Sequence, residues 1–332
     1  MTTHKWPVYG HDWAVDSLRQ SMATGRIRHA YLITGTPAVG KRTLAHIFAQ
    51  ALNCTHEDIA ARPCFQCRSC RLIDSDNHPD IVYSETDPST GALKIESIRN
   101  VTGRLALKPY EARYRIAIFH DFDHAQPRAQ DALLKTLEEA PPTAILILLA
   151  ESTETLISTI TSRCQMIHLR PAPVDVVRDV LLGRGSEMEQ ADLMARLSGG
   201  RIGWALAALR DPAVLEQRAQ ALDLLENCLQ ENRAGRFALA EGLGKDKLAL
   251  RPLLELWLTY WRDLLLLTED SPVKPCNSDR LVAMQRLAVD ITPEEALRAL
   301  QATQRTLDQL KWNLNTRLAV EVLFLEYPGL AR

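Results

Sequence analysis

A chain of 332 residues in which 46% are hydrophobic is long enough for two or three domains with cores of their own. The formal net charge of −2 gives no overall positive field, so any DNA contact has to come from a local patch or from partners. The first residues lack the apolar core of a secretion signal, and no stretch is apolar for the length of a membrane span. We therefore expect a cytoplasmic protein that does not span a membrane.

The N-terminal part predicts a helix, a strand and a second helix. Residues 11–23 carry apolar side chains at helical spacing, and residues 30–34 form a short β-rich run. A loop with two glycines and a lysine follows, and a second apolar-periodic helix ends at about residue 52. This order of strand, glycine loop, lysine and helix predicts a P-loop, whose backbone N–H groups and lysine hold the phosphates of a nucleotide.

The candidate nucleotide-binding residues of this loop are Gly35, Gly40, Lys41 and Thr43. A P-loop normally has a Ser or Thr hydroxyl directly after the lysine to hold Mg²⁺, but this chain has Arg42 there. Thr43 comes one position later and is rotated by about 100° around the helix, so it is not a simple replacement. The sequence leaves open whether ATP and Mg²⁺ bind at this site.

Four cysteines, Cys54, Cys64, Cys67 and Cys70, follow the P-loop helix. Clustered cysteines in a reducing compartment favour a metal over disulfides, and four thiolates favour tetrahedral Zn²⁺. Such a site has no open position for water, so we expect a structural zinc. An iron–sulfur cluster and unligated thiols are the alternatives.

An ATPase of this kind also needs a carboxylate at the end of an apolar strand some 80 residues after the P-loop. Residues 80–83 predict a strand, residues 94–107 a helix, and residues 114–120 a strand that runs into Asp121. Asp121 is therefore the candidate carboxylate that orients water on Mg²⁺. The next place, where an ATPase has the acid that polarises the attacking water, holds Phe122, which cannot act as a base. Asp123 is an alternative acid.

The region from residue 127 to residue 164 predicts an amphipathic helix stopped by Pro141 and Pro142, an apolar strand over 144–150, and a polar helical stretch. That stretch ends in Ser162-Arg163-Cys164, which brings one arginine to a surface. Arg163 either acts on a nucleotide held by another chain or pairs locally with an acid such as Glu138 or Glu151.

The sequence suggests three domains, over residues 1–169, 170–210 and 211–332. Strand signals stop beyond Leu169, and residues 174–210 predict three short helices with a break at residues 198–200 before the last. From about residue 212 the chain is leucine-rich and helical, with prolines at 252, 272, 275 and 293. A packed helical bundle that also serves oligomerisation fits this pattern.

Several stretches together closely resemble the bacterial clamp-loader subunits of DNA polymerase III. They are residues 25–35, the four cysteines, Asp131-Ala-Leu-Leu-Lys-Thr-Leu-Glu-Glu139 and Thr161-Ser-Arg-Cys164. The resemblance covers residues 1 to about 210, and the helical remainder is similar to the family's collar domain. It implies an α/β plus all-α protein: an AAA+ RecA-like parallel-sheet domain with a zinc module, a small helical lid domain and a C-terminal helical collar domain.

The family contains an ATP-hydrolysing gamma/tau branch and a non-hydrolysing delta-prime branch that shares the cysteines and the Ser-Arg-Cys motif. This chain departs from gamma/tau at Arg42, at Phe122 and at Gly203, where a sensor arginine would stand; Arg201 is a shifted candidate for that arginine. The resemblance therefore implies the delta-prime branch, in which Arg163 serves as an arginine finger at a neighbouring gamma/tau subunit. It also implies delta, the sliding clamp and, through the complex, primed DNA as partners.

Two other functions compete with this interpretation. An active gamma-like ATPase requires Thr43 and Asp123 to replace the lost groups. A zinc DNA-binding protein requires a basic face at the cysteines, where Arg62, Arg68 and Arg71 are offset by nearby acids.

Overall fold

The computed structural model describes residues 6–87, 91–244, 247–310 and 315–330. The chain forms two compact units, one of Met1–Val180 with Gly200–Trp204 and one of Leu181–Gly199 with Ala205–Arg332. Each unit is described by itself. The division into three domains that the sequence suggests stays a prediction.

The first unit is built on a five-stranded parallel sheet with the strand order β2-β3-β4-β1-β5. Leu32 in β1, which lies between β4 and β5, pairs with Leu148 on one side and with Met166 on the other. The structure confirms the four predicted strands and adds β5, which the sequence analysis does not predict. The strands are β1 Ala30–Thr34, β2 Ile81–Tyr83, β3 Arg115–Phe119, β4 Ala144–Ala150 and β5 Gln165–His168.

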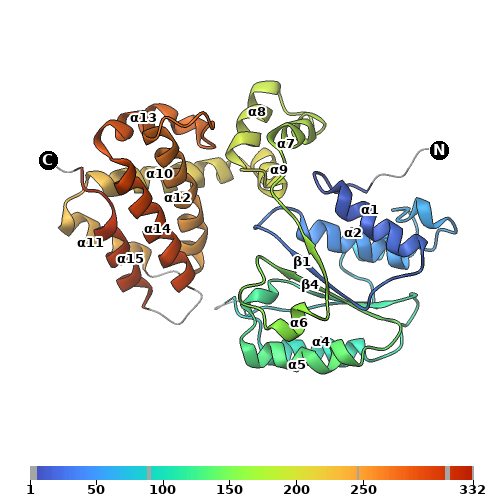
Figure 1. The fold of residues 1–332 in the computed structure, drawn as a ribbon. Helices are drawn as coiled ribbons and strands as arrows, with labels where there is room; N and C mark the ends of the chain where they lie inside the picture. Colours follow the sequence, from blue (N-terminus) through green and yellow to red (C-terminus); the bar gives the residue numbers. More distant parts are fainter. Residues whose placement is uncertain (1–5, 88–90, 245–246, 311–314, 331–332) are drawn as a thin grey trace. The chain divides into compact units, whose positions relative to one another are not determined.

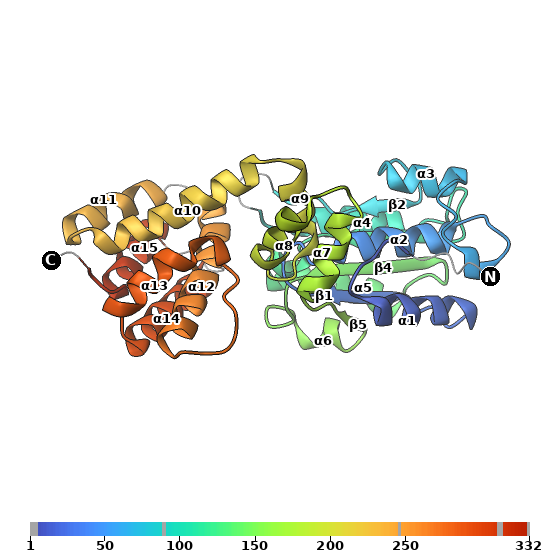
Figure 2. The same cartoon turned by 90° about the horizontal axis from the view of Figure 1, so that it is seen from above.

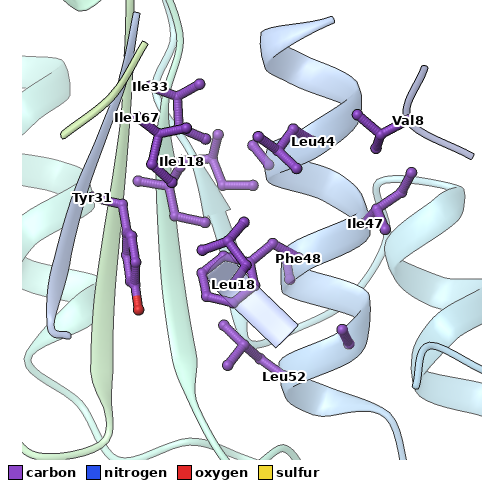
Figure 3. Packing of buried hydrophobic residues seen from close by; sticks show 14 of the residues in the cluster. Val8, Leu18, Tyr31, Ile33, Leu44, Ile47, Phe48, Leu52, Ile118 and Ile167 are labelled. Carbon is purple, nitrogen blue, oxygen red and sulfur yellow. The ribbon is translucent and has the colours of Figure 1, made fainter. Parts of the chain in front are cut away.

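Helices cover both faces of this sheet (Figure 1). Alternate strand residues point to opposite faces, so Ile33 and Ile118 join a core with Leu18 and Phe48 of the helices α1 and α2 (Figure 3). The strand residues between them pack against α4 and α5 on the other face. These helices and the shorter ones of this region are α1 Asp12–Ala23, α2 Lys41–Asn53, α3 Arg68–Asp74, α4 Ile95–Leu105, α5 Pro127–Glu138, α6 Ser158–Thr161 and α7 Val174–Leu182.

The second unit is helical throughout its described part, as predicted (Figure 2). Its core contains an aromatic cluster in which the rings of Trp261 and Tyr327 lie 5.0 Å apart. The helices of this region are α8 Met188–Leu197, α9 Ile202–Arg210, whose first residues belong to the first unit, α10 Ala213–Gln230, α11 Arg233–Leu243, α12 Lys247–Thr268, α13 Leu281–Asp290, α14 Pro293–Gln309 and α15 Thr316–Glu326. No helix in the described ranges is long and apolar enough to cross a membrane.

Two prolines of the second unit have different places in their helices. Pro252 lies inside α12, so it removes one backbone donor without ending the helix. Pro293 is the first residue of α14, where a missing N–H costs nothing, and Thr292 and Glu295 form a capping box there.

Candidate nucleotide site, cysteine cluster and surface arginine

The loop between β1 and α2 contains two glycines that its backbone requires. Gly40 caps α2 in the left-handed region at a φ of 115°, which a residue with a Cβ rarely adopts. At Gly35 a Cβ would lie 2.5 Å from the carbonyl oxygen of Leu169, so only glycine fits beside that strand end. The structure thus brings Gly35, Gly40 and Lys41 together as the sequence predicts.

The loop is held by contacts with its own chain. The Lys41 ammonium donates to the carbonyl oxygens of Gly35 and Thr36, the latter at 3.1 Å. The backbone N–H of Gly203, at the start of α9, donates to the Ala38 carbonyl at 2.8 Å, and a Cβ at Gly203 would meet the same oxygen. An amino acid with a side chain at position 203 would therefore push α9 away from the loop.

The two residues after Lys41 do not converge on a metal position. The Arg42 guanidinium lies 3.3 Å from the carboxylate of Asp76, and both side chains are largely exposed. Thr43 is exposed on the surface of α2. In this conformation neither side chain takes the place of the hydroxyl that holds Mg²⁺ in an active P-loop.

The end of β3 differs from the geometry that the sequence suggests. Asp121 is exposed and has a left-handed backbone conformation, and Phe122 is buried against Phe119 on the side of α4 and α5. By strand alternation His120, and not Asp121, shares the face of Ile118 that looks toward α2. The role of Asp121 as a nucleotide-site carboxylate stays a prediction, and the geometry favours position 120 for that place.

His120 belongs to an aromatic stack that sequence reasoning missed. Its ring lies 5.8 Å from that of Tyr83, and Tyr83 lies 5.5 Å from His46 of α2. Burial and, to a smaller extent, the nearby Arg42 charge lower the pKa of His120 to about 4. Burial also lowers the pKa of His46. Both rings are therefore neutral at physiological pH and bind β2, β3 and α2 together.

The four predicted cysteine ligands do come together. Their sulfur atoms all lie within 4.8 Å of one another, with Cys54 and Cys70 buried and the other two partly buried. Backbone N–H groups point at the sulfurs: Cys64 donates to Cys54 at 3.3 Å, Cys67 to Cys64 at 3.3 Å and Cys70 to Cys67 at 3.4 Å. Such bonds stabilise thiolates, which are the metal-binding form of cysteine.

The donor set fits a tetrahedral metal ion. Zinc–sulfur bonds of about 2.3 Å place the ligand sulfurs about 3.8 Å apart in a tetrahedron, which is compatible with the gathered cluster. Burial raises the pKa of the Cys67 thiol, but N–H donors from Thr55 and Cys70 outweigh it and lower the pKa to about 6. The cluster could hold a zinc ion with no position left for substrate.

Arg163 lies at the surface, between the end of α6 and the start of β5 along the chain. Its guanidinium lies 2.7 Å from the carboxylate of Glu138 and donates to the carbonyl oxygen of Thr159 at 3.0 Å. The side chains of Arg163 and Glu138 are 36% and 52% exposed. In the single chain the arginine therefore makes the local ion pair that the sequence analysis names as the alternative to a role at another subunit.

Comparison with known proteins gives a family. A family model described as "DNA polymerase III, delta subunit" matches residues 10–173. The delta′ subunit of DNA polymerase III from Bacillus subtilis is 26% identical over 312 residues, which cover 93% of this chain and 93% of that protein. The Pseudomonas aeruginosa delta′ subunit is 29% identical over 91% of this chain and 92% of its own. This chain belongs to the clamp-loader subunit family of DNA polymerase III.

The tau subunit of Escherichia coli matches over a smaller share of its own length. It is 30% identical over 255 residues, which are 73% of this chain and 39% of tau. A solved structure of a DNA polymerase III gamma subunit-related protein from Thermotoga maritima covers 94% of this clamp-loader subunit and 97% of that chain, with a TM-score of 0.42 and 16% identity.

Proposed function

We propose that this clamp-loader subunit has the delta-prime role: it does not hydrolyse ATP itself and supplies Arg163 to the ATP site of a neighbouring gamma/tau subunit. Similarity to delta′ proteins extends along nearly the whole chain, whereas tau is matched over less than half of its length. The proposal is carried by two features of the chain together: Arg163 is exposed, and the residue after Lys41, where a P-loop has its metal-binding hydroxyl, is Arg42.

The energies favour transfer of Arg163 to a partner. An exposed ion pair such as Arg163–Glu138 contributes about 0–1 kcal/mol. An arginine finger on the γ-phosphate is worth about 10³–10⁵ in rate, or roughly 4–7 kcal/mol of transition-state stabilisation. The local pair is therefore weak enough to break at assembly. The planar guanidinium of Arg163 can also bind two phosphate oxygens at once, which a lysine ammonium cannot do in the same way.

The chain's own nucleotide site lacks hydrolytic groups in the described conformation. Lys41 is bonded to loop carbonyls, Thr43 faces solvent, and one carboxylate oxygen of Asp123 is buried without a hydrogen-bond partner rather than presented to a substrate. A residue that positions a water molecule must lie within hydrogen-bond reach of it. Nothing in this arrangement favours the alternative of an active gamma-like ATPase.

Zinc is the metal that we propose for the cysteine cluster, in a structural role. When bound, it joins the segment around Cys54 to the segment of α3. The alternative of a zinc DNA-binding protein has less support, because Arg68 of α3 lies 3.7 Å from the carboxylate of Glu111. Its charge is partly compensated within the chain.

The partners that we propose are gamma/tau and delta subunits, joined through the helical second unit, and the sliding clamp and primed DNA through the assembled complex. In this role the chain is a stator. Its Arg163 completes the ATP site of the neighbouring gamma/tau subunit, which binds and hydrolyses ATP, while its own P-loop does not hydrolyse ATP.

The test is DNA-stimulated ATP hydrolysis by a complex reconstituted from this chain, gamma/tau, delta, clamp and primed DNA. Arg163→Ala should lower turnover by a factor of about ten or more, and Arg163→Lys should not restore it, because lysine lacks the fork. Arg184→Ala, at another exposed arginine, is the matched control. Turnover by the isolated chain, or full activity of the Arg163→Ala complex, would refute the proposal.

A further inference from the structure

The segment of residues 106–113, here called the 106–113 loop, joins α4 to β3 and exposes two large apolar side chains. Leu107 is 60% exposed and Tyr110 is 81% exposed. Neither side chain belongs to a core cluster of the first unit, and the two residues lie three positions apart in one short loop.

A buried carboxylate fixes the backbone of this loop. Asp80 is fully buried and accepts from the backbone N–H groups of Tyr110 at 2.6 Å and of Glu111 and Ala112 at 2.9 Å each. Arg115 donates to the same carboxylate at 2.9 Å. Charged hydrogen bonds of this kind are the strong ones, so the loop presents Tyr110 in one backbone conformation and little chain entropy is lost on contact.

Two residues next to cysteines of the cluster, Ser69 and Asn53, are linked by hydrogen bonds to Asp80 and to the end of the loop. Ser69, next to Cys70, lies 3.2 Å from one ring nitrogen of His78, and the other ring nitrogen accepts the backbone N–H of Asp80 at 3.1 Å. Asn53, next to Cys54, exchanges two hydrogen bonds of 3.0 Å with the backbone of Tyr114. Both connections start one residue from a cysteine of the cluster. One ends at Asp80, which holds the loop, and the other ends at Tyr114, the residue that follows the loop.

The surroundings of the two apolar side chains are basic. Arg104, Lys108 and Arg113 are exposed, and none of them makes an ion pair with a described residue. The one acid of the loop, Glu111, is engaged by Arg68 of α3. The loop thus carries its exposed apolar pair together with Lys108 and Arg113, whose charges form no ion pair within the described chain, and Arg104 precedes it at the end of α4.

We infer that the 106–113 loop is a docking surface for a protein partner that offers an apolar pocket with an acidic rim, and that the cysteine cluster with its metal sets the shape of this surface. Leu107 favours a protein over nucleic acid, because an aliphatic side chain neither stacks on bases nor binds phosphate. The basic border selects acidic groups around the pocket. This inference rests on the proposed function for the assembly in which the partner is met.

The docking is tested in the reconstituted complex of this chain with gamma/tau, delta, clamp and primed DNA. A photoreactive benzoylphenylalanine replaces Tyr110, and after irradiation we expect a covalent adduct with another protein chain, at a peptide that contains acidic residues. Lys108→Glu should lower the yield of the adduct about tenfold, and Lys274→Glu, an exposed lysine of the second unit, should leave it unchanged.

An adduct with DNA, or none in a complex that assembles by size-exclusion chromatography, would overturn the inference. Failure of the complex to assemble would instead speak against the proposed function.

The link to the cysteine cluster is tested on the isolated chain by hydrogen exchange. Removal of the metal with a chelator should make the amides of residues 110–112 exchange about tenfold faster or more, while amides of β4 keep their protection. Ser69→Ala keeps all four cysteines, removes only the contact with His78, and should act in the same direction. Unchanged exchange at residues 110–112 in the Ser69→Ala variant and after chelation would show that the cluster does not set the loop.

Discussion

Replacing Asp80 by asparagine tests the strongest buried electrostatic interaction of the first unit. The change keeps the size of the side chain and removes its charge. Asparagine has one oxygen and one NH₂ group, so it can accept on one side only and presents hydrogens toward amides that now donate to the carboxylate. Because one carboxylate oxygen takes the N–H groups of Glu111 and Ala112 and the other those of Tyr110 and Arg115, one of these pairs is lost in either orientation.

The loss is large because everything involved is buried. Asp80 is 0% exposed and Arg115 is 9% exposed. Removing one partner of a buried ion pair costs about 3–5 kcal/mol, and an unsatisfied buried donor costs about 1–3 kcal/mol. These terms overlap, so we expect Asp80→Asn to lower the free energy of unfolding of the first unit by about 3–5 kcal/mol, a sizeable part of the roughly 5–15 kcal/mol of a typical domain.

Native-state hydrogen exchange of the β3 and β4 amides in the full chain measures this loss directly, since these strands open only when the sheet does. The pH dependence gives a second readout. Burial raises the pKa of Asp80, but the hydrogen bonds from Tyr110, Glu111, Ala112 and Arg115 outweigh it, so the folded pKa lies below its usual range. The stabilisation is complete above the unfolded pKa of about 3.9 and fades as pH falls through the folded pKa.

The difference between wild type and Asp80→Asn should therefore shrink only in acid. A loss below about 1 kcal/mol at neutral pH would refute the reasoning, because exposed pairs already reach that value.

Three further outcomes follow from other buried or partnered groups. Arg236→Met should lower the free energy of unfolding of the second unit by about 2–4 kcal/mol, because the buried guanidinium donates to the carbonyls of Phe324, Tyr327 and Pro328. Hydrogen exchange of the α12 amides measures this loss. Arg233→Met, at an exposed arginine, is the control. The pKa of His120 is lowered to about 4 in the folded chain, so the unfolded chain takes up a proton near pH 6.5 before the folded chain does, and the free energy of unfolding falls from about pH 6.5 toward pH 4. His120→Phe keeps an aromatic ring in the stack and should flatten this pH dependence in urea unfolding. An unchanged pH dependence would contradict the reasoning. Glu138→Gln should leave the assembled ATPase within about twofold of wild type, since it only frees Arg163; a loss as large as that of Arg163→Ala would mean that Glu138 itself acts in the site.

The elements of the first unit were predictable where one physical pattern dominates. Continuous apolar runs gave β1, β3 and β4, and helical spacing gave α1 and α4. β5 escaped because it is a short edge strand whose side chains are mostly exposed or half-buried, so neither an apolar run nor a clean alternation marks it. The cysteine cluster was predictable from spacing alone, because few other structures require three cysteines in C-x2-C-x2-C.

Contacts between distant segments were not predictable in the same way. The partners of Asp80 lie 30 to 35 positions further along the chain, and a lone acid before a short strand carries no signal of them. His120 had a signal that went unused: it continues the alternation of Ile116 and Ile118, which places it on the face of α2. The assignment of Asp121 to the nucleotide site did not use this alternation, and it stays a prediction.

On the proposed function, the aromatic stack and the residue at position 42 bear on the same physical question, which is what a clamp-loader subunit needs when its own site does not hydrolyse ATP. An ATPase must keep space for Mg²⁺ and a water molecule between its P-loop helix and the neighbouring strand ends. Here the rings of His46, Tyr83 and His120 pack between α2 and the ends of β2 and β3. Partly buried, neutral rings bind these elements to one another but offer no ligand for Mg²⁺ comparable to a carboxylate. On the proposed function, rings that fill the space of Mg²⁺ and water suit a stator. An arginine that completes a neighbour's site has to be held by a domain that does not change conformation with a nucleotide of its own.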